Sequence, residues 1–371
     1  MPDLTYNPIP DRNEFTDSSQ QPRLDLGLRP LLLLVLLCGL IALFLVTLAV
    51  GSVTIPLDQV ITVLLGGEAD RASWTNIVLK FRLPRAVTAL LAGAALGVSG
   101  LLMQTFFHNP LAGPFVLGIS SGASLGVALV VLSAGTVGGT LLAGFGLSGD
   151  LLLASAAAIG ASLTLLLVVL VASRVQSSMT LLILGLMLGY LVSALVSLLL
   201  YFAIPERIQA YISWTFGSFG GVTWEQMPIL AGGISVGLVL ALVLTKSLNA
   251  LLLGEGYARS MGMNIRMVRL VVVIATALLA GTVTAFCGPI GFIGIAVPHL
   301  CRSLFNTSDH RLLVPGTILM GGLVALVAAL IAEVPGMDIA LPLNAVTALI
   351  GAPVLIVVIL RQRNLQQSFG G

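Results

Sequence analysis

Two groups of charged residues have the types and spacing needed to recognise another protein. Arg82 and Arg85 are three positions apart, so a helix would place them one turn apart on the same side. Paired guanidinium groups bind carboxylates well, which suits the docking of an acidic partner. The alternative is that the pair anchors a helix at the level of the lipid headgroups.

The second group lies in the polar segment 246–269, where Glu255 and Arg259 interrupt apolar sequence. We expect a short helix around 257–261 that ends at Gly262, because glycine readily takes the left-handed conformation that terminates helices. A folded basic segment between apolar runs must lie in water, and we expect it to contact a partner. The alternative is a solvated loop whose charges only orient the chain in a membrane.

Residues that would supply energy for transport are missing from the sequence. No Gly-rich Walker loop precedes Lys80 or Lys246, so the chain is not expected to hydrolyse ATP alone. The acidic residues nearest to apolar runs, Asp150 and Glu333, lie at their ends, whereas ion-coupled carriers need such groups at membrane depth. The driving force should therefore come from a partner. An ion-driven carrier is the competing class, and an intramembrane enzyme would need paired catalytic groups that the apolar runs lack.

No metal site, disulfide or bound cofactor is expected. His108, His299 and His310 fall at predicted cytoplasmic ends of helices and are not expected to form one site. The three cysteines have no CxxC spacing and lie in or beside apolar segments.

The composition defines a membrane protein. Hydrophobic residues make up 57% of the 371 residues and charged residues only 9%. Backbone groups in lipid must be hydrogen-bonded within their own segment, so the long apolar runs are predicted to be helices and the fold class is all-α. Ten membrane-spanning helices are predicted, at 30–50, 86–107, 115–132, 151–172, 180–202, 227–244, 270–286, 290–305, 313–332 and 343–360.

These helices form one predicted domain over 30–363, between a disordered tail at 1–29 and a second tail at 364–371. The segment 56–65 has apolar residues on one helix face, which predicts either a helix on the membrane surface or an ordinary packed loop helix. The segment 290–305 is short and contains a proline, so it either spans or is re-entrant.

The basic residues predict the orientation of the chain. With ten crossings, only Arg71, Lys80, Arg82, Arg85 and Arg207 fall on the side opposite to the termini. The remaining Lys and Arg lie on the side of 246–269. By the positive-inside rule, both termini and this segment are predicted to be cytoplasmic.

Gly93 and Gly97 form a pair of small residues four positions apart in the second predicted span. Such a pair lets a neighbouring helix approach closely, so we expect a packing role.

Several motifs occur in order along almost the whole chain and carry a resemblance to a known family. They are Arg82-Leu-Pro-Arg85, Ala92-Gly-Ala-Ala-Leu-Gly97, Asn109-Pro-Leu-Ala112, Gly254-Glu255 with Ala258-Arg259, Gly288-Pro-Ile-Gly-Phe-Ile-Gly294, Asp309-His-Arg311 and Gly351-Ala-Pro353. In these motifs the chain resembles the bacterial permeases that import iron-siderophore, haem and cobalamin through ABC transporters.

The resemblance implies a type II ABC importer permease: a homodimer of ten-helix subunits in the bacterial inner membrane. It implies two cytoplasmic ATPase subunits, which would bind ATP and Mg, and one substrate-binding protein outside. Lipid is the surrounding solvent, and no nucleic acid is involved. The implied substrate is a metal chelate, an iron-siderophore first, with haem or cobalamin as alternatives.

The resemblance also assigns roles to individual residues. Arg82 and Arg85 would dock the binding protein, and Glu333 stands where the family often has a third arginine, which predicts a compensating basic residue on the partner. The implied ATPase-coupling residues are Glu255, Tyr257, Ala258, Arg259, Met261 and Gly262, around an apolar core of Leu252, Leu253 and Met261. The implied cytoplasmic gate residues are Asn109, Leu111 and Ser178, although Asn109 before a proline is equally well explained as a turn former.

Overall fold

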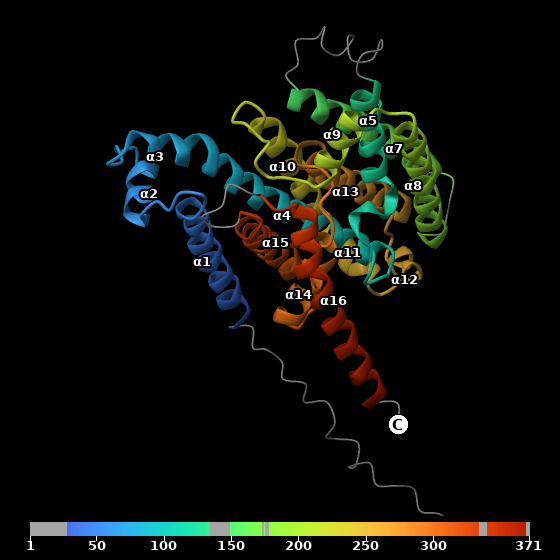
Figure 1. Ribbon diagram of the computed structural model, residues 1–371. Coiled ribbons are helices and arrows are strands. Elements are labelled where there is room, and N and C mark those ends of the chain that lie inside the picture. The colour runs from blue at the N-terminus through green and yellow to red at the C-terminus, as the bar shows by residue number, and fades with distance from the viewer. Residues whose placement is uncertain (1–27, 134–148, 173, 175–177, 334–339, 369–371) are drawn as a thin grey trace, which may run out of the picture.

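A computed structural model of the protein describes residues 28–133, 149–172, 174, 178–333 and 340–368. Within these ranges the chain is helical, apart from loops and one isolated bridge between Glu333 and Ala340. The all-α prediction is confirmed (Figure 1). Most of the predicted tail at 1–29 and the last three residues lie outside the described ranges, and the final helix continues to Ser368.

The helices follow one another in chain order with short connections. They are α1 (Leu28–Ala49), α2 (Leu57–Leu64), α3 (Ala72–Asn76), η1 (Ile77–Arg82), α4 (Leu83–Phe106), η2 (Pro114–Leu117), α5 (Ile119–Ser133), α7 (Gly149–Ala172), α8 (Ser178–Tyr201), α9 (Pro205–Thr215), α10 (Met227–Val243), α11 (Thr245–Leu251), α12 (Glu255–Ser260), α13 (Ile265–Cys287), α14 (Ile293–Phe305), α15 (His310–Ala332) and α16 (Leu343–Ser368). The element η1 is a π-helical turn that runs directly into α4.

The described helices agree with the predicted membrane segments. Six helices are long and apolar enough to cross a membrane, and α10 and α11 together form a seventh candidate, bent by 53°. Three shorter apolar helices, in α5, α14 and α16, fall at the remaining predicted segments. The prediction of about ten apolar helices is therefore consistent with the fold.

The helix α4 lies in the middle of the bundle. Every residue from Ala92 to Phe106 is buried. This helix packs against α15, α14 and α13, and Figure 1 shows it passing from α2 and α3 into the centre of the molecule. The helix α4 therefore connects the two ends of the bundle through a segment that is enclosed by other helices.

Glycines allow this close packing. A Cβ added at Gly93 would overlap the carbonyl oxygen of Gly321 in α15, and one at Gly97 would lie 3.0 Å from the Thr317 side chain. The two helices thus approach along the face that carries the small-residue pair, as close-packed membrane helices do.

The helix α14 does not cross the membrane by itself. Its 13 residues extend about 20 Å, less than the hydrocarbon thickness of about 30 Å. A Cβ at Gly100, well inside α4, would overlap the carbonyl oxygen of Gly294 near the start of α14. The helix therefore begins inside the bundle, in contact with the middle of α4.

The helix α2 is a packed helix. Val60 and Val63 are buried, while Leu57, Ile61 and Leu64 are exposed. Leu57, Ile61 and Leu64 lie on the predicted apolar face of the helix together with Val60. One part of that face is therefore buried in the protein, and the other part is exposed.

Candidate functional site

The predicted coupling segment, residues 246–269, contains most of α11, all of α12 and the start of α13, and two glycines with positive φ flank α12. Gly254 has φ +99° and Gly262 has φ +83°, values that strain a residue with a Cβ. After α12, the N–H of Met263 donates to the carbonyl of Ala258, and the N–H of Gly262 donates to that of Arg259. These bonds satisfy carbonyls at the helix end, so the predicted stop at Gly262 has its physical cause here.

The next helix starts at once. The side chain of Asn264 accepts a hydrogen bond from the N–H of Met267 at 3.1 Å and so caps α13. The polar segment is therefore folded along its length and is not a flexible loop.

The exposed side chains of α12 form a mixed apolar and basic surface. Tyr257 and Met261 are each 54% exposed, and Arg259 is also exposed. Ala258 is buried and holds the helix against the bundle. The expected apolar core of Leu252, Leu253 and Met261 is wrong, because all three side chains are exposed. The buried core of the segment consists of Leu248, Leu251, Ala258, Ile265 and Val268.

Glu255 points inward from α12. Its Oε1 lies 3.5 Å from Nη2 of Arg269 in α13. The Arg269 guanidinium in turn lies 5.8 Å from the centre of the Phe106 ring at the end of α4, a cation–π geometry. Arg269, the last residue of the segment, therefore connects it to α4 and also contacts Glu255. Sequence spacing could not reveal the contact with Phe106, because the two residues are far apart in the chain.

Two of the predicted gate residues, Asn109 and Leu111, lie just beyond the same end of α4. The Oδ1 of Asn109 accepts a hydrogen bond from the N–H of Leu111 at 3.0 Å, which is the bond of an Asx turn. Leu111 is exposed beyond this turn. Ser178 is the first residue of α8, and its side chain lies outside the described part of the structure. The geometry of Asn109 is that of a turn former, and the gate role stays a prediction.

At the opposite end of α4, Arg82 is turned into the protein. It is 7% exposed. One nitrogen donates to the carbonyls of Leu48 and Ala49 at 2.8 and 2.9 Å, and the other donates to the carbonyl of Val53. Arg82 therefore holds the C-terminal end of α1, and in this conformation its charge is not presented for docking as the sequence predicted.

Arg85 pairs within the chain. Its guanidinium forms an ion pair with Glu333 at the end of α15, and the two side chains are 20% and 26% exposed. Arg85 also lines a cavity of about 130 Å³ bounded by Phe219 and Pro342. Glu333 thus finds its basic partner on its own chain, so the expected compensating residue on another protein is not needed.

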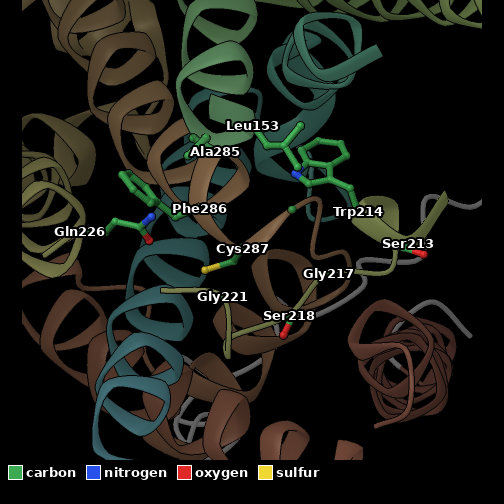
Figure 2. Close-up of a pocket in the computed structure, with 12 residues that line it drawn as sticks. Leu153, Ser213, Trp214, Gly217, Ser218, Gly221, Gln226, Ala285, Phe286 and Cys287 are labelled. Carbon is green, nitrogen blue, oxygen red and sulfur yellow. The ribbon is translucent and has the colours of Figure 1, made fainter. Parts of the chain in front are cut away.

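A second cavity lies at the same end of the bundle, where α13 ends. Its volume is about 120 Å³. Figure 2 shows Leu153 and Trp214 on one side of it and Gln226 and Phe286 on the other. A pocket for a drug-sized ligand is about 300 Å³ or more, so this cavity is too small to enclose a metal chelate.

The three histidines lie near the C-terminal end of α4, close to the coupling segment, but each has different hydrogen-bond partners. His299 is bonded to the carbonyl of Pro110 and His108 to that of Leu251, whereas His310 contacts Thr105 and Asn249. In the part of the chain that the structure describes, no three His, Cys, Asp or Glu side chains are grouped as metal ligands.

Solved structures establish the class of protein. An ABC transporter of the metal-chelate type, captured in an inward-facing conformation, matches with a TM-score of 0.77 and 30% identity, over 90% of this chain and 99% of that one. PsaBC from Streptococcus pneumoniae, solved with a Fab, shares the fold at a TM-score of 0.51 and 19% identity, over 75% of this chain and 90% of that one. The fold is that of an ABC importer permease.

The family model of the FecCD transport family matches residues 39–361, and the chain belongs to this family. The vitamin B12 import system permease protein BtuC of Citrobacter koseri is 39% identical over 298 residues, which cover 80% of this chain and 87% of the relative. The BtuC protein of Salmonella typhi is 38% identical over 285 residues, which cover 76% and 83%. The resemblance inferred from the motifs is confirmed.

Proposed function

We propose that this chain is the membrane subunit of an ATP-driven importer that carries a metal chelate from a binding protein outside to the cytoplasm. The observation that carries the proposal is the folded coupling segment, whose exposed Tyr257, Arg259 and Met261 form a compact surface next to the buried end of α4. A short helix between two glycines can pass a rigid-body displacement from a partner into the bundle.

The chemistry of energy supply belongs to the partner in this proposal. The chain has no Walker loop, so two ATPase subunits would bind ATP and Mg and press on the coupling segment. Both termini and this segment would then face the cytoplasm of a bacterial inner membrane. A binding protein would deliver the substrate near Arg85, at the other end of α4.

We propose a homodimer, with the substrate path between two copies. A cavity of about 340 Å³ lies between α7, α10 and α13, at the small end of pockets for drug-sized ligands. A path between subunits can be wider than any such cavity. The resemblance of the sequence motifs, which implies a homodimer, supports this arrangement.

For the substrate, we propose a cobalamin as the first ligand to test, because the relatives at 38–39% identity are vitamin B12 permeases. The sequence predicted an iron-siderophore first, with haem or cobalamin as alternatives, so siderophore and haem complexes are to be tested beside cobalamin. In this proposal the binding protein largely selects the ligand, so uptake must be measured with the binding protein present.

The test is uptake into proteoliposomes that contain the permease with its ATPase and binding protein. We expect labelled cobalamin to accumulate with ATP inside, to fail without the ATPase and to be unaffected by an uncoupler. Accumulation by the permease alone, or collapse of uptake with the uncoupler, would show an ion-driven carrier instead. Uptake of a siderophore but not cobalamin would reassign the substrate while leaving the transport class in place.

A further inference from the structure

The side-chain amide of Asn249 joins the coupling segment to the start of α15. Its Nδ2 donates to Oδ1 of Asp309 at 2.6 Å. Its Oδ1 lies 2.9 Å from the backbone N–H of His310 and 2.8 Å from Nδ1 of the same residue. One half-buried amide on α11 therefore makes three contacts with two consecutive residues at the beginning of α15.

These contacts define the proton positions on the histidine ring. Because Asp309 fixes Nδ2 as a donor, Oδ1 must accept, and Nδ1 of His310 carries the proton. The neutral ring then offers Nε2 as an acceptor. The Thr105 hydroxyl lies 2.8 Å from Nε2 and 2.9 Å from the carbonyl of Leu101. Its single proton can go to only one of these two acceptors, and with Nε2 unprotonated the contact with the ring requires the hydroxyl to donate to Nε2.

The hydrogen bonds from Asn249 through His310 to Thr105 form a relay that ends at the C-terminal end of α4. Other residues of the coupling segment also contact this end of α4. Thr105 and His310 are buried, at 2% and 1% exposure. His108, just beyond α4, is bonded through Nε2 to the carbonyl of Leu251 at the end of α11. The cation–π contact of Arg269 with Phe106 lies between these two residues. Three connections thus join the coupling segment to the end of α4 and the residues after it: to Thr105 through His310, to Phe106 and to His108.

We propose that Asn249 is a positioning residue for transport: it fixes α11 to α15 and, through His310 and Thr105, to the end of α4. The proposal rests on the proposed function of the coupling segment. Gly254 and Gly262 permit bending around α12. A displacement applied to α12 passes more completely to α4 and α15 if α11 is held, because a free α11 would let the segment bend and absorb part of it.

The first test measures uptake of labelled cobalamin per ATP hydrolysed by the reconstituted complex. We expect Asn249→Ala to lower this ratio by at least about fivefold, the lower range of coupling energies between sites, while the complex still assembles and hydrolyses ATP. Asn264→Ala is the matched control: it removes another asparagine–backbone bond in the same segment but no contact with α4 or α15. An unchanged ratio in Asn249→Ala, or an equal loss in the control, would overturn the proposal.

A second pair of variants keeps the proposal testable if Asn249→Ala does not assemble. Thr105→Val has nearly the same shape but no hydroxyl, and we expect it to lower uptake per ATP. Thr105→Ser retains the hydroxyl and should restore the ratio, whereas a packing role would make serine no better than valine. Equal behaviour of valine and serine would contradict a relay through His310.

A measurement without the ATPase separates this inference from the proposed function. Spin labels at Ser260 and Arg311, both exposed, would report the distance between α12 and the start of α15 after Cys38→Ser removes the exposed thiol. We expect a wider distance distribution in Asn249→Ala than in the wild type or Asn264→Ala, and an unchanged distribution would count against the link. If the distribution widens but the wild-type permease never binds an ATPase, the proposed function fails while the link stands.

Discussion

Arg85 of α4 and Glu333, the residue that follows α15, form an ion pair at the end of the bundle opposite to the coupling segment. Next to them, Arg82 is buried against the carbonyls that end α1. Two arginines one helical turn apart therefore have different tasks: one closes a helix end, and the other remains partly accessible and paired.

Changing Glu333 should alter the docking of a binding protein. In Glu333→Gln the Arg85 guanidinium loses its internal carboxylate, so we expect severalfold tighter binding of an acidic partner, with stronger dependence on salt. Arg85→Glu should weaken binding in the same assay. A docking titration at two salt concentrations checks both variants. Equal affinities for the wild type, Glu333→Gln and Arg85→Glu would show that Arg85 does not take part in docking and only anchors the helix.

Changing Arg82 should affect stability more than docking. Hydrogen bonds to charged groups contribute about 1.5–3 kcal/mol each, so Arg82→Gln, which loses most of its contacts with three carbonyls, should lower the free energy of unfolding by at least about 2 kcal/mol. Arg82→Lys should be only a partial replacement, because an ammonium cannot match the fork of a guanidinium. Thermal unfolding in detergent measures the change in stability. Unchanged stability in Arg82→Gln would mean that the carbonyls at the end of α1 are hydrogen-bonded by water when the guanidinium is absent.

Filling the contact between α4 and α15 should destabilise the bundle. Gly93→Ala places a methyl group on the Gly321 carbonyl, and overpacking of this kind costs about 1–3 kcal/mol. Gly232→Ala in α10 is the control, because a Cβ there meets nothing within 4 Å. We expect a lower melting temperature only in the first variant, and equal melting temperatures would show that the helices separate without cost.

Changing the exposed surface of α12 should weaken the ATPase interaction without affecting the fold. We expect Arg259→Glu to reduce ATP-driven uptake about tenfold or more, as loss of a central arginine does at many interfaces, with an unchanged melting temperature. Glu255→Gln should instead reduce stability slightly, because Glu255 pairs internally with Arg269. Pull-down with the ATPase and thermal unfolding separate the two effects, and normal uptake in Arg259→Glu would remove this residue from the interface.

Asp309 should make the link to Asn249 sensitive to acid. Partial burial raises the pKa of this carboxyl, but hydrogen bonds from the Arg311 N–H and the Asn249 amide, with nearby positive charge, outweigh it and lower the pKa overall. A lowered folded-state pKa stabilises the protein above the unfolded value, and this contribution is lost as pH falls below about 4. Because Asp309 is largely exposed, we expect a small effect, visible as a melting temperature that falls less steeply with acid in Asp309→Asn.

Much of the architecture could be predicted from local sequence. Apolar runs must become helices in lipid because backbone groups there have no water to bond, so composition predicts the segments 270–286 and 313–332. The helices α13 and α15 begin earlier, at Ile265 and His310. The stop of α12 at Gly262 was also predictable, because left-handed backbone is a local property of glycine. The motifs were sufficient to identify the family.

Only the tertiary structure decided which charges are available. Arg82 and Arg85 have the same residue type and neighbouring positions, yet one meets the end of α1 and the other meets Glu333, almost 250 positions further along the chain. Likewise, nothing near Asn249 in the sequence reveals that its amide contacts Asp309 and His310. Helix periodicity determines which side of a helix a residue occupies, but the neighbour on that side depends on how the helices pack.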